Sequence, residues 1–284
     1  MGAARTNDRP DVASCGIAVM AKASLPGKTK TRLVPPLSFE EAAAFNTAFL
    51  KDVAANIAAA GREAPVACYM AYGPPGATAF FESNFPASIG LIESWHPNFG
   101  DCLFTAVAAV LARGHAGAVV LNADSPTLPT ALLVETARAL AQPGDRAVLG
   151  PSNDGGYYLL GLKAPHRRLF EDVAWSTEQV AQQTRARAAE IGLDVHVLPE
   201  WYDVDDIASL RTLRAEVIEG RAFASACSGE VDAGSPVRTC ANERPDLHPA
   251  PATHTAALLG LLLASTDLGR RLDAAGSIAM RAAE

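Results

Sequence analysis

The chain has 284 residues, of which 49% are hydrophobic, and its mean hydropathy of +0.10 excludes a wholly disordered protein. This length fits one large domain, or a domain of roughly 220 residues with an appendage. The net charge of −7 and the pI of about 5.4 argue against nucleic acid as a partner, because no basic excess is available to neutralise its phosphates.

The cysteines and the apolar runs predict a soluble, cytoplasmic protein. The five cysteines are scattered and show no Cys-x-x-Cys spacing, so neither a disulfide framework nor a zinc site is expected. The first fourteen residues are polar and lack the apolar core of a secretory signal. The longest apolar run near the C-terminus, residues 256–264, is too short to cross a bilayer. We therefore expect no membrane span.

Strand-like and helix-like segments alternate from residue 15 to residue 219. The segments with the pattern of buried strands are 16–21, 65–70, 89–92, 116–123, 146–149, 157–160 and 193–198. The segments with a helical pattern are one that opens near Ser38, then 101–113, 130–141, 176–191 and 205–219. Capping-box spacing is found for Ser38 with Glu41 and for Ser176 with Gln179. This alternation predicts an α/β fold of three layers, α/β/α, with a mostly parallel sheet.

The composition changes after residue 220 and divides the chain. We expect a flexible N-terminus over 1–14, an α/β domain over 15–220, a linker over 221–252 and a small helical extension over 253–284. The sequence of the extension shows no residue pattern typical of a catalytic site. It could dock a partner or form a homo-oligomer, or it could be a mobile tail.

A cationic loop is expected directly after the first predicted strand. Four cations fall within eleven residues, namely Lys22, Lys28, Lys30 and Arg32. Such a loop can surround a phosphate, and backbone N–H groups near Gly27 can add to the binding. Gly27-Lys28-Thr29 has the end of a P-loop motif, but the glycine that should precede it is missing, so a P-loop is rejected. The alternative is a solvated basic loop.

A carboxylate ends the central predicted strand. Asn122-Ala-Asp-Ser-Pro-Thr-Leu-Pro129 follows directly on the apolar run 116–121. Ligands of open α/β sheets bind at the carboxyl ends of the strands, so Asp124 is placed where a phosphate-bound metal ion would lie. A turn or helix-cap role is the alternative. Magnesium usually takes one or two carboxylates together with substrate phosphates, so Asp124 needs a partner.

Candidates for that partner lie in Trp201-Tyr-Asp-Val-Asp-Asp206. Asp203 and Asp205 alternate, so in an extended segment both point to one face. Asp205 or Asp206 could instead cap the helix that follows. Clustered carboxylates repel one another unless a cation or water neutralises them, which favours a cation near this segment.

A glycine-rich turn separates the predicted strands 146–149 and 157–160. Its residues Asp154, Gly155 and Gly156 allow a ligand to approach the backbone closely, and the alternative is an Asp-Gly hairpin turn. Trp175, before the next predicted helix, is a lid or a core aromatic. The chain has no Gly-x-Ser-x-Gly, His-Glu-x-x-His or Gly-x-Gly-x-x-Gly motif, which argues against the corresponding hydrolases, metalloproteases and dehydrogenases.

Five segments, in this order, resemble a bacterial family of glycosyltransferase-A-like proteins. The segments are Ala21–Leu33, Asn122–Pro129, Gly150–Gly161, Trp175–Thr177 and Asp203–Asp205. That family includes the arsenosugar-biosynthesis type of glycosyltransferase and is similar to the phospholactate and phosphoenolpyruvate guanylyltransferases. The resemblance covers about residues 15 to 219.

The resemblance implies a glycosyltransferase-A fold that binds a nucleotide-activated donor with Mg²⁺ or Mn²⁺. It assigns phosphate contacts to the cationic loop, at Lys22, Gly27, Lys28, Lys30 and Arg32. Asp124 would be a metal ligand, with Asp203 or Asp205 as its second carboxylate. Asp154, Gly155, Gly156 and Trp175 would face the acceptor or sugar. Catalysis is expected to depend on Asp124, Asp154 and Lys28.

These residues lead to one preferred function and two alternatives. We expect a metal-dependent transfer of a glycosyl group from a nucleoside diphosphate sugar to a small acceptor. The first alternative is a guanylyltransferase-like nucleotidyltransferase that acts on a small phosphorylated acceptor. The second is a non-catalytic nucleotide-sugar-binding protein, favoured by Phe104, since relatives commonly carry an arginine there.

Overall fold

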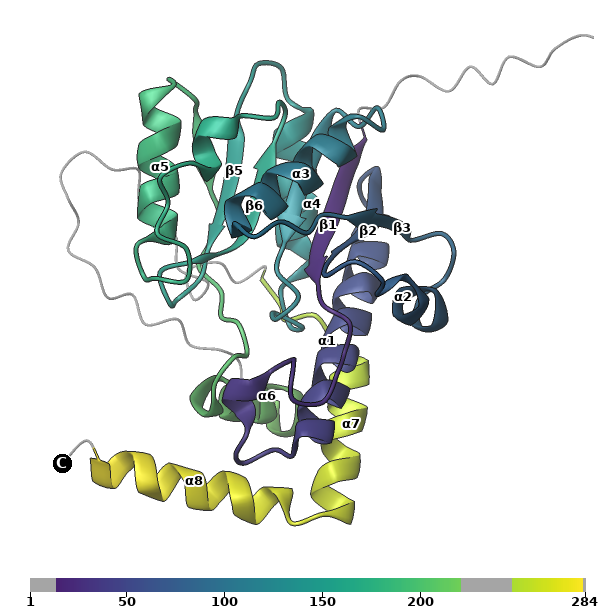
Figure 1. Cartoon of the computed structure of the whole chain (residues 1–284), viewed down its shortest axis with the longest axis vertical. Helices are drawn as coiled ribbons and strands as arrows, with labels where there is room; N and C mark the ends of the chain where they lie inside the picture. Colours follow the sequence, from purple (N-terminus) through teal and green to yellow (C-terminus); the bar gives the residue numbers. More distant parts are fainter. Residues whose placement is uncertain (1–13, 221–246, 283–284) are drawn as a thin grey trace, which may run out of the picture.

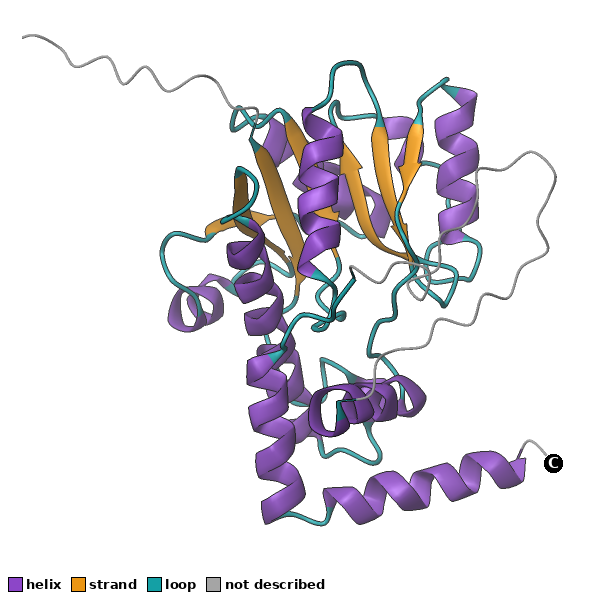
Figure 2. Cartoon of the chain, turned by 180° about the vertical axis from the view of Figure 1, so that it is seen from behind, coloured by secondary structure: helices purple, strands orange, loops and turns teal. Residues whose placement is uncertain are grey.

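The computed structural model describes residues 14–220 and 247–282, so almost all of the predicted N-terminal segment 1–14 and most of the predicted linker 221–252 lie outside the described residues. At its centre is a seven-stranded sheet with helices on both faces (Figure 1, Figure 2). This confirms the predicted three-layer α/β fold with a mostly parallel sheet.

The strands follow the order β3-β2-β1-β4-β6-β5-β7 across the sheet. Neighbouring strands are parallel except at β6, which runs antiparallel to both β4 and β5. The bounds of the strands are β1 Cys15–Ala21, β2 Val66–Tyr72, β3 Gly90–Glu93, β4 Gly117–Leu121, β5 Ala147–Pro151, β6 Tyr157–Leu162 and β7 Val195–Val197.

Two hydrophobic cores lie on opposite faces of the sheet. Strand β1 shows the alternation that produces them, because Ile17 and Val19 pack in one core and Ala18 packs in the other. The first core includes residues of α1, α4, α6, α7 and α8, and the second includes residues of α3, α5 and η2. The helices are α1 Phe39–Ala60, α2 Thr78–Asn84, α3 Phe99–Leu111, α4 Thr130–Ala141, η2 Arg167–Phe170, α5 Val180–Glu190, α6 Ile207–Glu219, α7 Thr253–Ser265 and α8 Leu268–Ala282.

The structure confirms one predicted capping box and corrects another. Ser38 Oγ accepts a hydrogen bond from Glu41 N at 3.1 Å, and Glu41 Oε2 accepts one from Ser38 N at 2.7 Å, so α1 begins as predicted. The prediction for Ser176 is wrong. Ser176 has a φ of 65°, and α5 begins only at Val180 without a side-chain cap. Helix α2 was not predicted from the sequence.

The C-terminal helices pack on the α/β domain. Helix α7 lies along α1, and α8 passes beneath α6 (Figure 1). Asp52 of α1 is 3% exposed, and its two carboxylate oxygens accept hydrogen bonds from the backbone N–H groups of His254 and Thr255, each at 2.8 Å. Leu268 and Leu272 of α8 are fully buried. Within residues 14–220 and 247–282, no helix combines the length and apolar character needed to cross a membrane.

Replacing Asp52 by alanine should lower the free energy of unfolding by about 2 kcal/mol, because two buried N–H groups at the start of α7 would lose their acceptors. Asp52→Asn keeps one acceptor oxygen and should cost about half as much. Urea unfolding measures both, with Lys51→Ala as the neighbouring control. A loss for Asp52→Ala no larger than for the control would show that α7 does not depend on this cap.

Candidate active site

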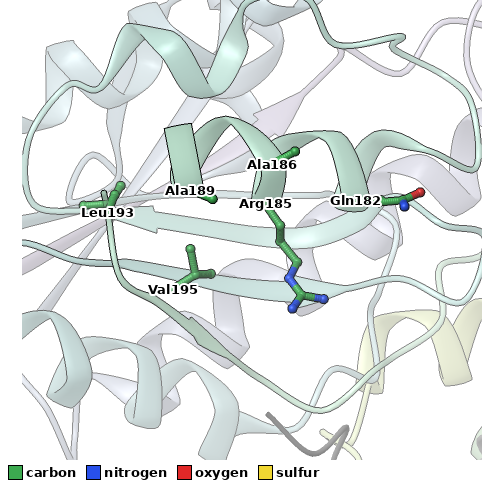
Figure 3. Close-up of a pocket in the computed structure, with 6 residues that line it drawn as sticks. All are labelled: Gln182, Arg185, Ala186, Ala189, Leu193 and Val195. Atoms are coloured by element: carbon green, nitrogen blue, oxygen red, sulfur yellow. The ribbon is translucent and has the colours of Figure 1, made fainter. Parts of the chain in front are cut away.

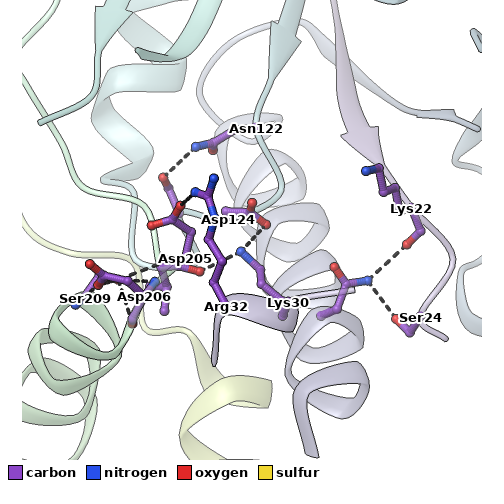
Figure 4. Close-up of polar contacts among 12 residues, drawn as sticks. Lys22, Ser24, Lys30, Arg32, Asn122, Asp124, Asp205, Asp206 and Ser209 are labelled. Atoms are coloured by element: carbon purple, nitrogen blue, oxygen red, sulfur yellow. Dashed lines mark hydrogen bonds and ion pairs between the residues drawn. The ribbon is translucent and has the colours of Figure 1, made fainter. Parts of the chain in front are cut away.

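The candidate site lies at the carboxyl end of the parallel strands, between β1 and β4. From β1 the chain passes to β2 and β3 on one side of the sheet and then returns to β4 on the other side. Ligands of open α/β sheets bind in the crevice at such a switch point. The cationic loop leaves β1 here, and Asp124 follows β4 at the same edge (Figure 4).

Lys30 occupies the centre of this site (Figure 4). Its Nζ lies 2.8 Å from Asp124 Oδ1 and donates a hydrogen bond to the carbonyl of Val204 at 2.6 Å. The same nitrogen lies 5.4 Å from the centroid of the Phe49 ring, where a cation is attracted by the π-system. The Lys30 side chain is only 6% exposed, whereas that of Asp124 is 35% exposed. Lys30 therefore neutralises the carboxylate that the sequence predicts as a metal ligand.

Backbone contacts join the loop after β4 to the segment before α6. Val204 N donates to the carbonyl of Asp124 at 2.8 Å, and Ser125 Oγ donates to the carbonyl of Tyr202 at 2.8 Å. Thr127 Oγ1 also donates to the Tyr202 hydroxyl at 3.0 Å. These bonds explain why Asp203 lies near Asp124 although the two are far apart in the sequence.

The two remaining aspartates of the 203–206 segment have different partners. Asp206 caps α6, since its Oδ1 accepts a hydrogen bond from Ser209 N at 2.7 Å. Asp205 is left out of the cap and pairs instead with Arg32 of the cationic loop, with 2.8 Å between Nη1 and Oδ2. The Arg32 side chain is 76% exposed. Exposed ion pairs contribute at most about 1 kcal/mol, so a ligand can displace this one at little cost.

The pKa of Asp203 reflects the negative charge gathered at the centre of the site. Burial, and after it the neighbouring carboxylates of Asp154, Asp205 and Asp124, raise the pKa of Asp203 to about 7, although the Lys30 ammonium lowers it in part. Four carboxylates are thus close enough to interact around one buried ammonium. This centre would bind a further cation favourably.

The other cationic residues of the loop lie away from the carboxylates. Lys22 lies apart from this cluster (Figure 4), and its carbonyl accepts a hydrogen bond from Asn46 Nδ2 at 3.0 Å. Gly27 has a φ of 72° in a turn closed by a 3.0 Å hydrogen bond from Lys28 N to the carbonyl of Leu25. Lys28 is exposed. The structure therefore brings Lys30 and Arg32 to the carboxylates and leaves Lys22 and Lys28 in solvent.

The glycine-rich turn connects β5 to β6. The Oδ1 atom of Asp154 accepts a hydrogen bond from Gly156 N at 2.8 Å, as in a local turn. Gly155 has a φ of 86°, and a Cβ atom there would lie 2.0 Å from the carbonyl oxygen of Glu178. Gly155 is therefore needed for close packing against the chain before α5, and Asp154 is exposed at the rim of the acidic centre.

Trp175 belongs to an aromatic group beside the turn. Its ring centroid lies 5.5 Å from that of Phe99 and 6.5 Å from that of Tyr157, both in edge-to-face geometry. A Cβ atom on Gly100 would lie 2.9 Å from Trp175 Nε1, so the indole packs against the start of α3. Sequence reasoning missed Phe99 and Tyr157, although Tyr157 directly follows the glycine pair. Phe104 stacks with the Arg167 guanidinium, 4.9 Å from its ring centroid.

The carboxylates at this edge would hold a divalent cation only together with phosphate and water ligands. Within the described part of the chain, no group of three or more His, Cys, Asp or Glu residues is arranged to hold a metal ion. Mg²⁺ needs only one or two carboxylates when phosphates and water complete its shell. The Oδ1 atom of Asn122 is buried at the same edge without a hydrogen-bond partner, so it is available as a further oxygen ligand for a cation.

A hollow of about 390 Å³ lies elsewhere, beside α5 and the edge strand β7 (Figure 3). Its lining residues are Gln182, Arg185, Ala186, Ala189, Leu193 and Val195. It contains none of the predicted site residues and no carboxylate, so the acidic centre remains the candidate site.

Comparison with known proteins supports the fold. Residues 56–177 match the family described as "Uncharacterized protein conserved in bacteria (DUF2064)". This stretch contains Asp124, Asp154 and Trp175, but neither the cationic loop nor the 203–206 segment. A search of curated proteins finds no match.

Solved structures show the same architecture. A protein from Desulfovibrio desulfuricans G20, described provisionally as a nucleotide-diphospho-sugar transferase, is 23% identical with a TM-score of 0.69, and the match covers 92% of this chain and 98% of that one. The predicted resemblance is thereby confirmed at the level of the fold. A CMP:2-keto-3-deoxy-manno-octonic acid synthetase in complex with CTP is more distant, with 13% identity, a TM-score of 0.47 and coverage of 73% and 100%.

Proposed function

We propose that this protein is a transferase that binds a nucleotide-activated donor together with Mg²⁺ or Mn²⁺. The observation that carries the proposal is the meeting of Lys30 and Arg32 with Asp124, Asp203 and Asp205 at the switch point of the sheet. Cations attract the phosphates of the donor, and carboxylates hold the metal that bridges them. The fold shared with the Desulfovibrio protein is compatible with this function.

The proposed roles follow from the position of each residue. Asp124 and either Asp203 or Asp205 would hold the divalent cation, which would supply charge neutralisation of the diphosphate when bound. Arg32 would exchange its exposed pair with Asp205 for a phosphate oxygen. Lys30 would hold the cationic loop beside Asp124 through its ion pair with this carboxylate and its hydrogen bond to the carbonyl of Val204. Asp154 lies in the glycine-rich turn between β5 and β6 and Trp175 lies beside it, and both would face the sugar or acceptor.

Glycosyl transfer is the preferred reaction, as in the family that the sequence resembles. Nucleotidyl transfer to a small phosphorylated acceptor would use the same phosphates and metal and would break the bond at the α-phosphorus instead. A non-catalytic protein would bind the nucleotide sugar at the same residues without transferring the sugar to an acceptor. The three differ in product, so a turnover assay separates them.

A nucleotide at one hundred times its dissociation constant should stabilise the protein by about 2.7 kcal/mol, and only when Mn²⁺ or Mg²⁺ is present. A thermal-shift screen of nucleoside diphosphates, triphosphates and nucleoside diphosphate sugars measures this, with EDTA as the control. Product analysis for the ligands that bind then assigns the reaction. The absence of any shift across the nucleotides, with either metal, would overturn the proposed function.

A further inference from the structure

Arg271 of α8 binds the far end of the cationic loop. Its Nη2 lies 2.7 Å from Glu41 Oε1 and its Nη1 lies 2.9 Å from Glu41 Oε2, which is a bidentate pair. The Nη1 group also donates a hydrogen bond to the carbonyl of Pro36. Asp267, directly before the start of α8, pairs with the same guanidinium, with 2.7 Å between Oδ1 and Nε. The Glu41 side chain is only 13% exposed, so this contact is shielded from water.

The loop between Lys30 and Pro36 has two short-range backbone hydrogen bonds, from Leu33 N to the carbonyl of Lys30 at 3.0 Å and from Val34 N to the carbonyl of Thr31 at 3.1 Å. It contains the single short 3₁₀ turn η1, Thr31–Leu33, and two prolines that cannot donate backbone hydrogen bonds. Leu33 is buried, but Arg32 is exposed and carries one surface ion pair. Besides these local bonds and the burial of Leu33, the Lys30 contacts fix one end of the loop and the Arg271 contact fixes the other.

The segment that leads into α7 also reaches the opposite wall of the site. Ala250 N donates a hydrogen bond to the carbonyl of Thr127 at 3.0 Å, three residues after Asp124. The described C-terminal residues 247–282, which include the last residues of the predicted linker, thus contact both the loop that carries the cations and the loop that carries Asp124. Among the side chains that the structure describes, residues 253–275 of α7 and α8 supply none to the acidic centre.

We propose that Arg271 is a positioning residue that holds Lys30 and Arg32 in place for the phosphates of the nucleotide. This proposal rests on the proposed function, and it gives the C-terminal extension a role in supporting the site from outside. The bidentate pair also lowers the pKa of Glu41 through the Arg271 hydrogen bond, which keeps the pair ionised at neutral pH.

The test compares Arg271→Gln with two variants that remove the same charge nearby, one on α6 where it contacts the extension and one on the extension itself. Arg214→Gln removes the 3.4 Å pair between α6 and Asp273 of α8, and Arg270→Gln changes the exposed neighbour of Arg271. We expect amide exchange over residues 31–37 to rise about tenfold in Arg271→Gln only, since an ionised hydrogen-bond partner is lost. Arg271→Lys, which keeps the charge but not the bidentate geometry, should fall between Arg271→Gln and the parent.

Nucleotide binding with Mn²⁺ provides the second readout. The affinity should fall about tenfold in Arg271→Gln and stay within about twofold of the parent in both controls. Unchanged exchange over residues 31–37 would overturn the proposal, and so would an equal loss of affinity in Arg214→Gln. If the parent protein binds no nucleotide, the proposed function fails, while the exchange experiment still decides whether Arg271 holds the loop.

Discussion

Replacing Lys30 by methionine should lower the free energy of unfolding by about 2 kcal/mol. Methionine keeps the aliphatic stem beside Phe49 but removes the ammonium that pairs with Asp124 and donates to the carbonyl of Val204. Removing one partner of a fully buried ion pair costs about 3 to 5 kcal/mol, because the other charge stays buried. Asp124 is 35% exposed, so water can replace part of the lost interaction and the expected cost is smaller.

Lys28→Met is the matched control, because Lys28 lies in the same loop but is exposed. Chemical denaturation of Lys30→Met, Asp124→Asn and the double variant gives the coupling between the two side chains. Residues in direct contact should show a coupling of at least about 0.5 kcal/mol. If Lys30→Met costs no more than Lys28→Met, the buried ion pair does not stabilise the protein.

Local patterns were enough to predict the framework of the sheet. The β1 and β4 segments are short apolar runs, and a run of this kind bounded by turn residues identifies a buried strand without further information. Helix α1 was predicted correctly at its start because the Ser38–Glu41 capping box is a local device. The same spacing failed at Ser176, where packing of the turn against Glu178 and a positive φ place the start of α5 later.

The composition of the site was predictable, but its pairing was not. Asp124 could be placed at the end of a strand, and Asp203 and Asp205 could be recognised as alternating carboxylates. Nothing in either segment says that Val204 will hydrogen-bond to Asp124, because that bond depends on how the chain returns before α6. The burial of Lys30 has the same origin, since its partners come from three distant segments.

Replacing Asp124 by asparagine should weaken Mn²⁺-dependent nucleotide binding by more than about 100-fold. Mutation of a residue that only hydrogen-bonds to a metal ligand already lowers metal affinity about 10- to 100-fold. Asp124 is proposed to bind the ion directly, so its replacement should have a larger effect. The asparagine oxygen can still lie against the Lys30 ammonium, which keeps its hydrogen bond to the carbonyl of Val204, so the free energy of unfolding should fall much less than in Lys30→Met. Calorimetric titration of the nucleotide with and without Mn²⁺ measures the effect.

Asp206→Asn is the matched control, because it removes the same charge three residues from Asp203 and yet keeps the cap of α6, where asparagine serves as well as aspartate. Its affinity should stay within about threefold of the parent, since only long-range charge is lost. A general loss of negative charge would weaken metal binding equally in both variants, whereas a ligand role weakens it in Asp124→Asn alone. If Asp124→Asn and the parent bind the nucleotide with equal affinity in the presence of Mn²⁺, Asp124 is not a metal ligand. Its described side-chain role is then the ion pair with Lys30.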